Sequence, residues 1–125
     1  VEMYDPQTDS WQQKASLPRA GSRRVAAVMG GKIYVSGGYR DGGSAVSTLL
    51  MFDPQANTWT ELPSMGTARG DHASAAIGGK LYVFGGWVLD GERTASVEAY
   101  DLISNTWAQV SDLSVARDEF MAVEL

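Results

Sequence analysis

Short apolar runs bounded by turn-forming residues recur along the chain. The segment Lys32–Ser36 reads Lys-Ile-Tyr-Val-Ser and lies between the pairs Gly30-Gly31 and Gly37-Gly38. Aromatic and β-branched residues favour strands, and paired glycines permit the positive φ angles of a tight hairpin turn. The four tryptophans, five tyrosines and fourteen glycines likewise suit short strands and tight turns. The pattern therefore predicts an all-β fold.

The same pattern returns 48 residues later, where Lys80–Phe84 precedes Gly85-Gly86. The spacing also joins other landmarks with no insertion or deletion: Trp11, Trp59 and Trp107; Tyr4, Phe52 and Tyr100; Asp5, Asp53 and Asp101; and Leu17, Met65 and Leu113. A fixed spacing of this size, with one strand-rich unit in each period, is typical of radial repeat proteins. Each period is therefore expected to form one four-stranded blade of a β-propeller.

The repeat divides the chain into two whole blades and two partial ones. In each whole period we expect a strand of small residues (A), the strand before the glycine pair (B), an alternating strand (C) and a tryptophan strand (D). Residues 1–20 then hold strands C and D, 21–68 and 69–116 are whole blades, and 117–125 hold one further A strand. The antiparallel blades would pack radially and form an incomplete ring. Unpaired strand edges associate readily, so we expect a longer natural protein or copies that assemble to complete the ring.

Each hairpin between strands C and D uses the same turn chemistry. In the second copy Asp53 can bond the backbone two residues on, Pro54 fixes φ, and Asn57 tolerates the left-handed position that closes the turn. The tryptophan that follows the turn recurs in every copy, as Trp11, Trp59 and Trp107. We therefore expect these tryptophans to pack in the core.

Composition narrows the classes of partner. A formal net charge of −5 opposes the broad basic surface that binding to nucleic acid requires. The chain has no cysteine, so it needs no oxidising compartment and has neither a thiolate nucleophile nor a cysteine-bound zinc ion. No apolar run approaches the roughly 18 residues of a membrane span. We expect a cytoplasmic protein without nucleic-acid or membrane partners.

The repeat resembles the kelch family over the whole chain. The residues that carry the resemblance are the paired glycines after Ile33-Tyr34-Val35 and Leu81-Tyr82-Val83, the aromatic-Asp-Pro turn, and Asn57-Thr58-Trp59. There are departures: Gly21 stands where the later copies have Arg69 and Arg117, and Leu102 stands where the second turn has Pro54. The resemblance implies a kelch-type β-propeller, of which this chain encodes fewer than three blades.

The resemblance also implies where a peptide would bind. In kelch substrate receptors the contacting positions follow the glycine pair, precede strand C, and surround the arginine before strand A. On this chain those positions are Tyr39 and Trp87; Thr48 and Ser96; Arg69 and Arg117; and, two places beyond the arginine, Arg23, Asp71 and Glu119. Two alternatives remain open: the aromatic side chains could merely cover loop backbone, and the arginines could pair with acidic residues of a neighbouring blade.

His72 is the only histidine, and it stands between Asp71 and Ala73. One histidine and one carboxylate fall short of a metal site, and the nearby Ser74 does not establish a catalytic triad. We expect no catalytic residues, no metal and no cofactor in this chain.

Three functions remain open. The leading hypothesis is a protein-interaction module that recognises a peptide or protein segment through its loops, with the substrate receptor of a cullin-type ubiquitin ligase as one form. The alternative is part of an enzyme or glycan-binding propeller of the sugar mutarotase or oxidase type, which the lone histidine and missing cysteines disfavour. A third is a piece made to study propeller assembly, with no natural ligand.

Overall fold

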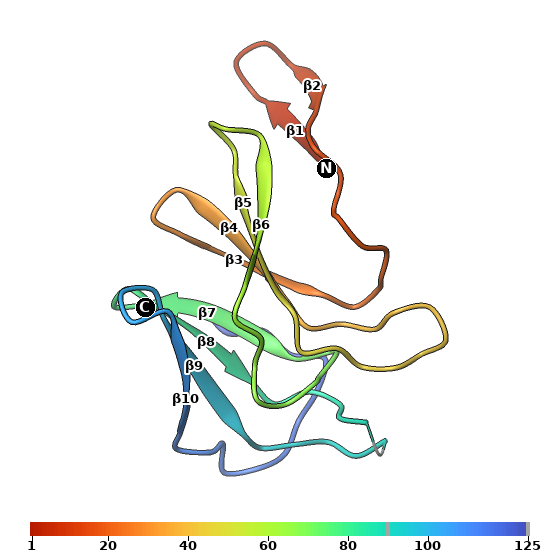
Figure 1. Ribbon diagram of the computed structural model, residues 1–125, viewed down its shortest axis with the longest axis vertical. Coiled ribbons are helices and arrows are strands. Elements are labelled where there is room, and N and C mark those ends of the chain that lie inside the picture. Colours follow the sequence, from red (N-terminus) through yellow and green to blue (C-terminus); the bar gives the residue numbers. More distant parts are fainter. Residues whose placement is uncertain (90, 125) are drawn as a thin grey trace.

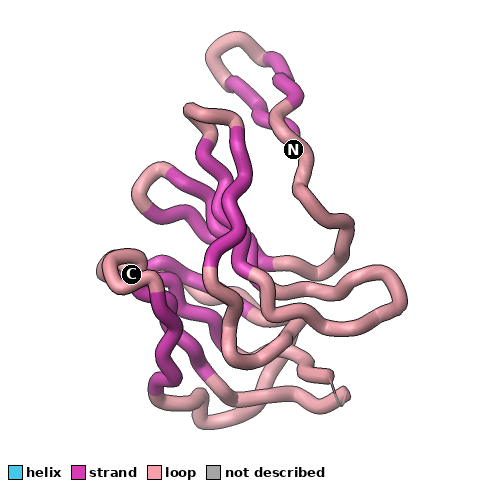
Figure 2. The backbone as a smooth tube through the Cα atoms, viewed as in Figure 1, coloured by secondary structure: helices cyan, strands magenta, loops and turns pink. Residues whose placement is uncertain are grey.

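The computed structural model describes residues 1–89 and 91–124, and its regular elements there are all strands. Figures 1 and 2 show them: β1 (Glu2–Asp5), β2 (Ser10–Gln13), β3 (Val25–Met29), β4 (Lys32–Ser36), β5 (Leu49–Asp53), β6 (Thr58–Leu62), β7 (Ala73–Ile77), β8 (Lys80–Phe84), β9 (Val97–Asp101) and β10 (Thr106–Val110). Nothing in the described ranges forms a helix with the length and apolar character that spanning a bilayer would require. The predicted all-β fold is confirmed.

Two four-stranded antiparallel sheets form the body of the molecule. Their strands lie in the orders β3-β4-β5-β6 and β7-β8-β9-β10, so each strand pairs with its neighbour in the sequence. The innermost strands β3 and β7 pack against each other, and their small side chains allow the two sheets to approach closely. These two sheets have the kelch blade arrangement, and the blade boundaries at residues 20, 68 and 116 stay a prediction.

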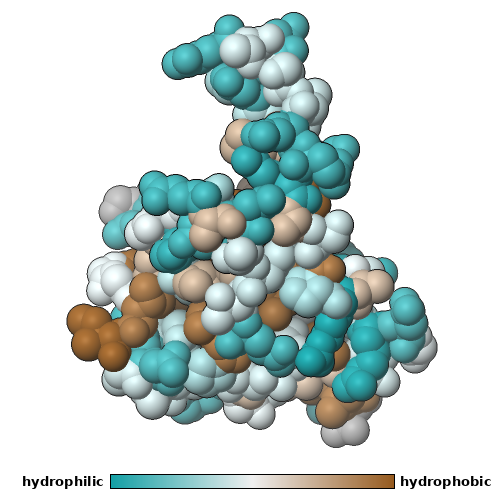
Figure 3. Space-filling view, turned by 45° about the horizontal axis from the view of Figure 1, so that its top comes forward, coloured by the Kyte–Doolittle hydropathy of each residue, from teal (hydrophilic) through white to brown (hydrophobic). Residues whose placement is uncertain are grey.

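The ends of the chain are less complete. Strands β1 and β2 form a two-stranded hairpin that projects from the body in Figure 1, and in Figure 3 its surface is mostly hydrophilic in colour. At the other end, residues 117–124 form no strand, although the repeat predicts an A strand there. A strand needs a hydrogen-bonding partner, and strand B of that period lies outside the chain.

The core lies between the two complete sheets. Tyr34 and Leu49 from one sheet meet Leu81 and Tyr100 from the other, and each of these side chains is at most 2 % exposed. Burial of a large apolar side chain stabilises a protein by about 1.5 to 3 kcal/mol. This shared cluster therefore fixes the position of one blade against the next.

The three repeated tryptophans lie at the same strand position but differ in exposure. Each packs against the aromatic residue opposite it, with ring centroids 5.2 Å apart for Tyr4–Trp11, 4.9 Å for Phe52–Trp59 and 5.3 Å for Tyr100–Trp107. The indole nitrogen of Trp59 donates to the Ala15 carbonyl at 3.0 Å, and that of Trp107 donates to the Pro63 carbonyl at 2.7 Å. These two bonds join each whole blade to the segment before it.

Core packing is the wrong expectation for Trp11, which is 68 % exposed. Among the described residues its hairpin is a separate two-stranded sheet, β1-β2. Trp59 and Trp107 are half-buried. The tryptophan position therefore joins neighbouring blades, and its burial depends on which neighbours are present.

Candidate binding face

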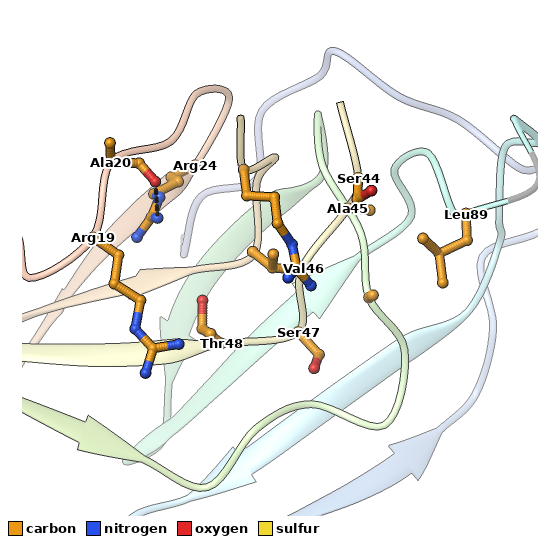
Figure 4. Close-up of a pocket in the computed structure, with 11 residues that line it drawn as sticks. Arg19, Ala20, Arg24, Ser44, Ala45, Val46, Ser47, Thr48 and Leu89 are labelled. Carbon is orange, nitrogen blue, oxygen red and sulfur yellow. Dashed lines mark hydrogen bonds between the residues drawn. The ribbon is translucent and has the colours of Figure 1, made fainter. Parts of the chain in front are cut away.

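A pocket of about 430 Å³ opens beside the loop that joins β4 to β5 (Figure 4). It is lined by Arg19, Ala20 and Arg24 from the segment leading into β3, by Arg40, Ser44, Ala45, Val46, Ser47 and Thr48 from the β4–β5 loop, and by Ala68 and Leu89. We call this hollow the arginine pocket. Sequence reasoning named only Thr48 among its lining residues as a candidate.

The lining of the arginine pocket carries three arginines and no acidic residue. Arg19 pairs with Glu61 at 3.2 Å, and both side chains are about half exposed or more. Arg24 donates to the carbonyl of Ala20 at 3.1 Å, but its Nε is buried without a hydrogen-bond partner. Within the described part of the chain, neither Arg24 nor Arg40 has a carboxylate in ion-pair range. The pocket is thus locally positive in a chain of net charge −5.

Comparison of the two complete blades shows why the pocket exists. In the second blade the side chain of Arg69 fills the position that corresponds to the arginine pocket, and it is fully buried. It donates to the carbonyl of Gly85 at 2.8 Å, the carbonyl of Ser96 at 2.9 Å, the Ser96 hydroxyl at 2.8 Å and Glu98 Oε1 at 2.8 Å. Burial lowers the pKa of Arg69, and the hydrogen bond that it donates to Glu98 partly opposes that shift. Arg69 therefore holds its own blade together.

The first blade lacks both charged members of this network. Gly21 stands at the place of Arg69, and Leu50 stands at the place of Glu98. Glu98 also accepts from the backbone of Gly66 at 2.6 Å, and the residue 48 places before Gly66 is Pro18, which has no N–H. The hydroxyl of Thr48 corresponds to that of Ser96, and Thr48 lines the pocket instead of serving an internal arginine.

Gly21 also makes room for Arg24. A Cβ atom added at Gly21 would lie 2.7 Å from Nη2 and 2.8 Å from Nε of Arg24, closer than such atoms approach. Arg24 occupies the position that is His72 in the second blade and Phe120 in the third copy. The unusual glycine and the unusual arginine thus form one local arrangement at the edge of the pocket.

A second hollow of about 220 Å³ adjoins the first and shares Ser44, Ala45 and Leu89 with it. Tyr39 and Trp87, both predicted to contact a ligand, line this hollow and are half-buried. The ring of Tyr39 covers Gly70 so closely that an added Cβ would lie 2.1 Å from its Cε2. Burial raises the pKa of Tyr39, and the nearby Asp71 adds to the shift.

Trp87 is held by two charged neighbours. Its indole nitrogen donates to the carboxylate of Asp118, and the guanidinium of Arg93 lies 5.2 Å from the centre of its ring. Arg93 also pairs with Asp118 at 2.5 Å. These contacts fix the ring as one wall of the second hollow and leave its other side accessible.

The remaining predicted residues lie elsewhere. Arg69 and Ser96 are hydrogen-bonded to each other inside the second blade, and the acidic partner of Arg69 is Glu98 of the same blade and not of a neighbouring one. Arg23 is exposed and pairs with Asp71 at 2.9 Å and with Glu119 at 3.8 Å. The last residue of the set, Arg117, is exposed, with its guanidinium 5.9 Å from the centre of the Phe120 ring. The structure therefore does not gather the predicted residues into one site.

Arg23, Asp71 and Glu119 share an uncommon backbone conformation. Their φ angles are +53°, +52° and +51°, in the left-handed region that non-glycine residues seldom adopt. The backbone N–H of Glu119 donates to the Asp71 carbonyl at 2.9 Å, and the Arg23 side chain bridges Asp71 and Glu119. The hydrogen bond that Arg23 donates to Asp71, followed by the charge of Asp71, raises the pKa of Arg23. This row connects three successive copies of the repeat.

His72 is buried, with 3 % of its surface exposed. Its Nε2 lies 2.8 Å from the hydroxyl of Ser36, and its Nδ1 has no hydrogen-bond partner. Burial, and then the charge of Arg69, lowers the pKa of His72 to about 3. The imidazole is thus neutral near pH 7 and out of reach of a substrate. Within the described ranges, no three His, Cys, Asp or Glu side chains gather as a metal site would require.

The fold and the loop face together define a β-propeller repeat protein. The family model described as the KLHDC2/KLHL20/DRC7 Kelch-repeats domain matches residues 1–119, and the chain belongs to this kelch-repeat family. Among curated proteins the chain is similar to Kelch-like protein 35 of Homo sapiens, with 46 % identity over 43 residues. That match covers 34 % of this chain and 7 % of the human protein. Kelch-repeat domains are typically protein-interaction modules.

Proposed function

We propose that this chain is the part of a kelch propeller that binds an acidic segment of a partner protein in the arginine pocket. The observation that carries the proposal is the set of three arginines around one hollow, with no acidic residue in its lining. A guanidinium can donate two parallel hydrogen bonds to one carboxylate, and such bonds are stronger than those between neutral groups. Arg24 lines the pocket without a carboxylate partner in the described part of the chain, so an anion would compensate its charge.

The second hollow supports the same function. Tyr39 and Trp87 present stiff apolar surface next to the arginine pocket. Aromatic and arginine side chains together provide most of the binding energy in many protein interfaces. A segment with an apolar residue a short distance from its acidic residue would match both hollows.

The wider biological role belongs to the same proposal. A substrate receptor of a cullin-type ubiquitin ligase in the cytoplasm would need such a face, and membership of the kelch family favours this role. Co-purification of the parent protein with a cullin tests it, and a parent protein without any cullin-binding partner would contradict it. Copies of the chain could also complete the ring, which light scattering would detect as an oligomer; a stable, well-folded monomer would argue against this.

The binding proposal is tested with two degenerate peptide pools that differ only in acidic or amide side chains, Asp and Glu against Asn and Gln. Fluorescence anisotropy should show binding of the acidic pool alone. Arg40→Gln, which changes an exposed residue of the pocket, should weaken binding about tenfold, the effect of losing one charge-assisted hydrogen bond. Arg117→Gln makes the same change outside the pocket and should leave binding unchanged. Equal binding of both pools, or no effect of Arg40→Gln, would refute the proposal.

A further inference from the structure

We propose that the acidic group which the arginine pocket takes is a phosphorylated serine or threonine of the partner. This inference rests on the proposed function and specifies its ligand. The second blade provides the comparison, because there a buried arginine and glutamate fill the corresponding place and neutralise each other. In the first blade both residues are gone, and the positions hold Gly21 and Leu50.

The charge balance of the pocket favours a dianion. Arg19 is compensated by Glu61, whereas Arg24 and Arg40 have no carboxylate partner in the described part of the chain. Two positive charges therefore remain in the lining. A phosphate ester carries about −1.5 to −2 at pH 7, and a carboxylate carries one negative charge. A single Asp or Glu side chain would leave one guanidinium unmatched.

The hydrogen-bond donors around the pocket also favour a phosphate over a carboxylate. Arg24 and Arg40 both line the pocket, and Arg40 offers an exposed guanidinium. Ser44, Ser47 and Thr48 add hydroxyl groups to the lining, and Figure 4 shows their side chains among those that line the pocket. A phosphate has three strong acceptor oxygens, which suits donors arriving from several directions. A carboxylate has two oxygens in one plane and would satisfy fewer of these donors.

The proposal commits to a phosphorylated protein segment. A nucleic acid would also bring phosphates, but the chain has a net charge of −5 and lacks the extended basic surface that tracks a phosphate backbone. The apolar walls of the adjoining hollow, formed in part by Tyr39, Trp87 and Leu89, suit a peptide that continues beyond its phosphorylated residue.

The test uses three degenerate peptide pools that share all other positions and carry phosphoserine, glutamate or serine at one fixed place. Fluorescence anisotropy should show the phosphoserine pool binding at least about tenfold more tightly than the glutamate pool, since one further charge-assisted hydrogen bond supplies such a factor. Arg24→Gln and Arg40→Gln should each remove that preference, and Arg117→Gln should keep it. Arg40 is exposed, so its variant tests the pocket even if Arg24→Gln perturbs the fold. Circular dichroism of each variant monitors folding.

The possible results distinguish failure of this inference from failure of the proposed function, which is the binding of an acidic segment. Equal affinity for the phosphoserine and glutamate pools, lost in Arg40→Gln, would overturn the inference and leave the proposed function standing. Absence of binding to either pool would overturn both. A phosphoserine preference that survives Arg40→Gln would place the site elsewhere. Sodium phosphate is the remaining probe: if it moves the arginine Nε–H signals in NMR spectra and saturates as tightly as the phosphoserine pool, the pocket is a free-phosphate site and the peptide inference fails.

Discussion

Burial of His72 should make the stability of this domain fall steeply below neutral pH. The pKa of His72 is about 3 in the folded chain, against an ordinary value of 6.5. The unfolded chain therefore binds a proton on His72 as the pH falls below 6.5, and the folded chain does not bind it until the pH approaches 3. Stability is lost through that window, at a limiting slope of about 1.4 kcal/mol per pH unit. Between pH 7 and pH 5 the loss from this residue amounts to about 2 kcal/mol.

The measurement is urea unfolding at pH 7 and pH 5 for the natural chain and for His72→Gln, which stays uncharged at both pH values. Glutamine keeps a donor and an acceptor near the Ser36 hydroxyl, so the variant isolates the titration as far as one substitution can. Asp53 and Asp101 have lowered pKa values and also affect acid stability, but they do so equally in both proteins. The pH-dependent loss should be about 2 kcal/mol smaller in the variant. Equal losses in the two proteins would refute the argument that His72 is buried in its neutral form.

Three further substitutions test the packing. Arg69→Met should lower the free energy of unfolding by about 3 to 5 kcal/mol because it leaves the buried carboxylate of Glu98 without its partner. Arg117→Met should change the free energy of unfolding little, and chemical denaturation measures both variants. Trp59→Phe should lower the free energy of unfolding by about 1 kcal/mol more than Trp11→Phe does, because only Trp59 of the two donates a hydrogen bond to the preceding segment. Equal losses in chemical denaturation would contradict this role. Gly70→Ala should displace the ring that covers it, visible as shifted aromatic NMR signals, and an unchanged spectrum would contradict the close packing.

The blade could be predicted from the sequence because its determinants repeat at fixed spacing. The glycine pairs and the Asp turns act within a few residues, so the chain alone fixes where strands begin and end. Asp5, Asp53 and Asp101 each accept a backbone N–H two residues on at 2.8 to 2.9 Å, although Asp101 is followed by Leu-Ile where the other two are followed by Pro-Gln. Exposure was less predictable, since the burial of Trp11 depends on contacts between blades rather than on its own sequence neighbours.

The candidate site could be predicted only in part. Family positions identified Thr48, Tyr39 and Trp87 on two adjoining hollows, but the same reasoning also named Arg69 and Ser96, which bond each other inside a blade. A position in a repeat does not reveal whether its side chain serves a ligand or its own blade. That choice depends on partners contributed by distant residues.

Arg24 and Arg40 were missed because neither lies at a repeated arginine position. Their signal was present in the differences between copies: Gly21, Leu50 and Arg24 all depart from the second blade. Each departure alone looks like ordinary variation. Only the side-chain contacts show that the loss of one buried ion pair makes room for an arginine that faces a pocket.

The same comparison explains the exposure of Arg117. Its counterpart Arg69 is buried by acceptors that lie 16, 27 and 29 residues further along the chain. Counted from Arg117, those places fall beyond the 125 residues of this sequence. Exposure of Arg117 in this structure is therefore not evidence for a ligand. In a chain that continues the repeat, a serine 27 residues after Arg117 and a glutamate 29 residues after it would bury Arg117 as Arg69 is buried. An aliphatic residue in place of the glutamate would leave its charge free, as the first blade does for Arg24.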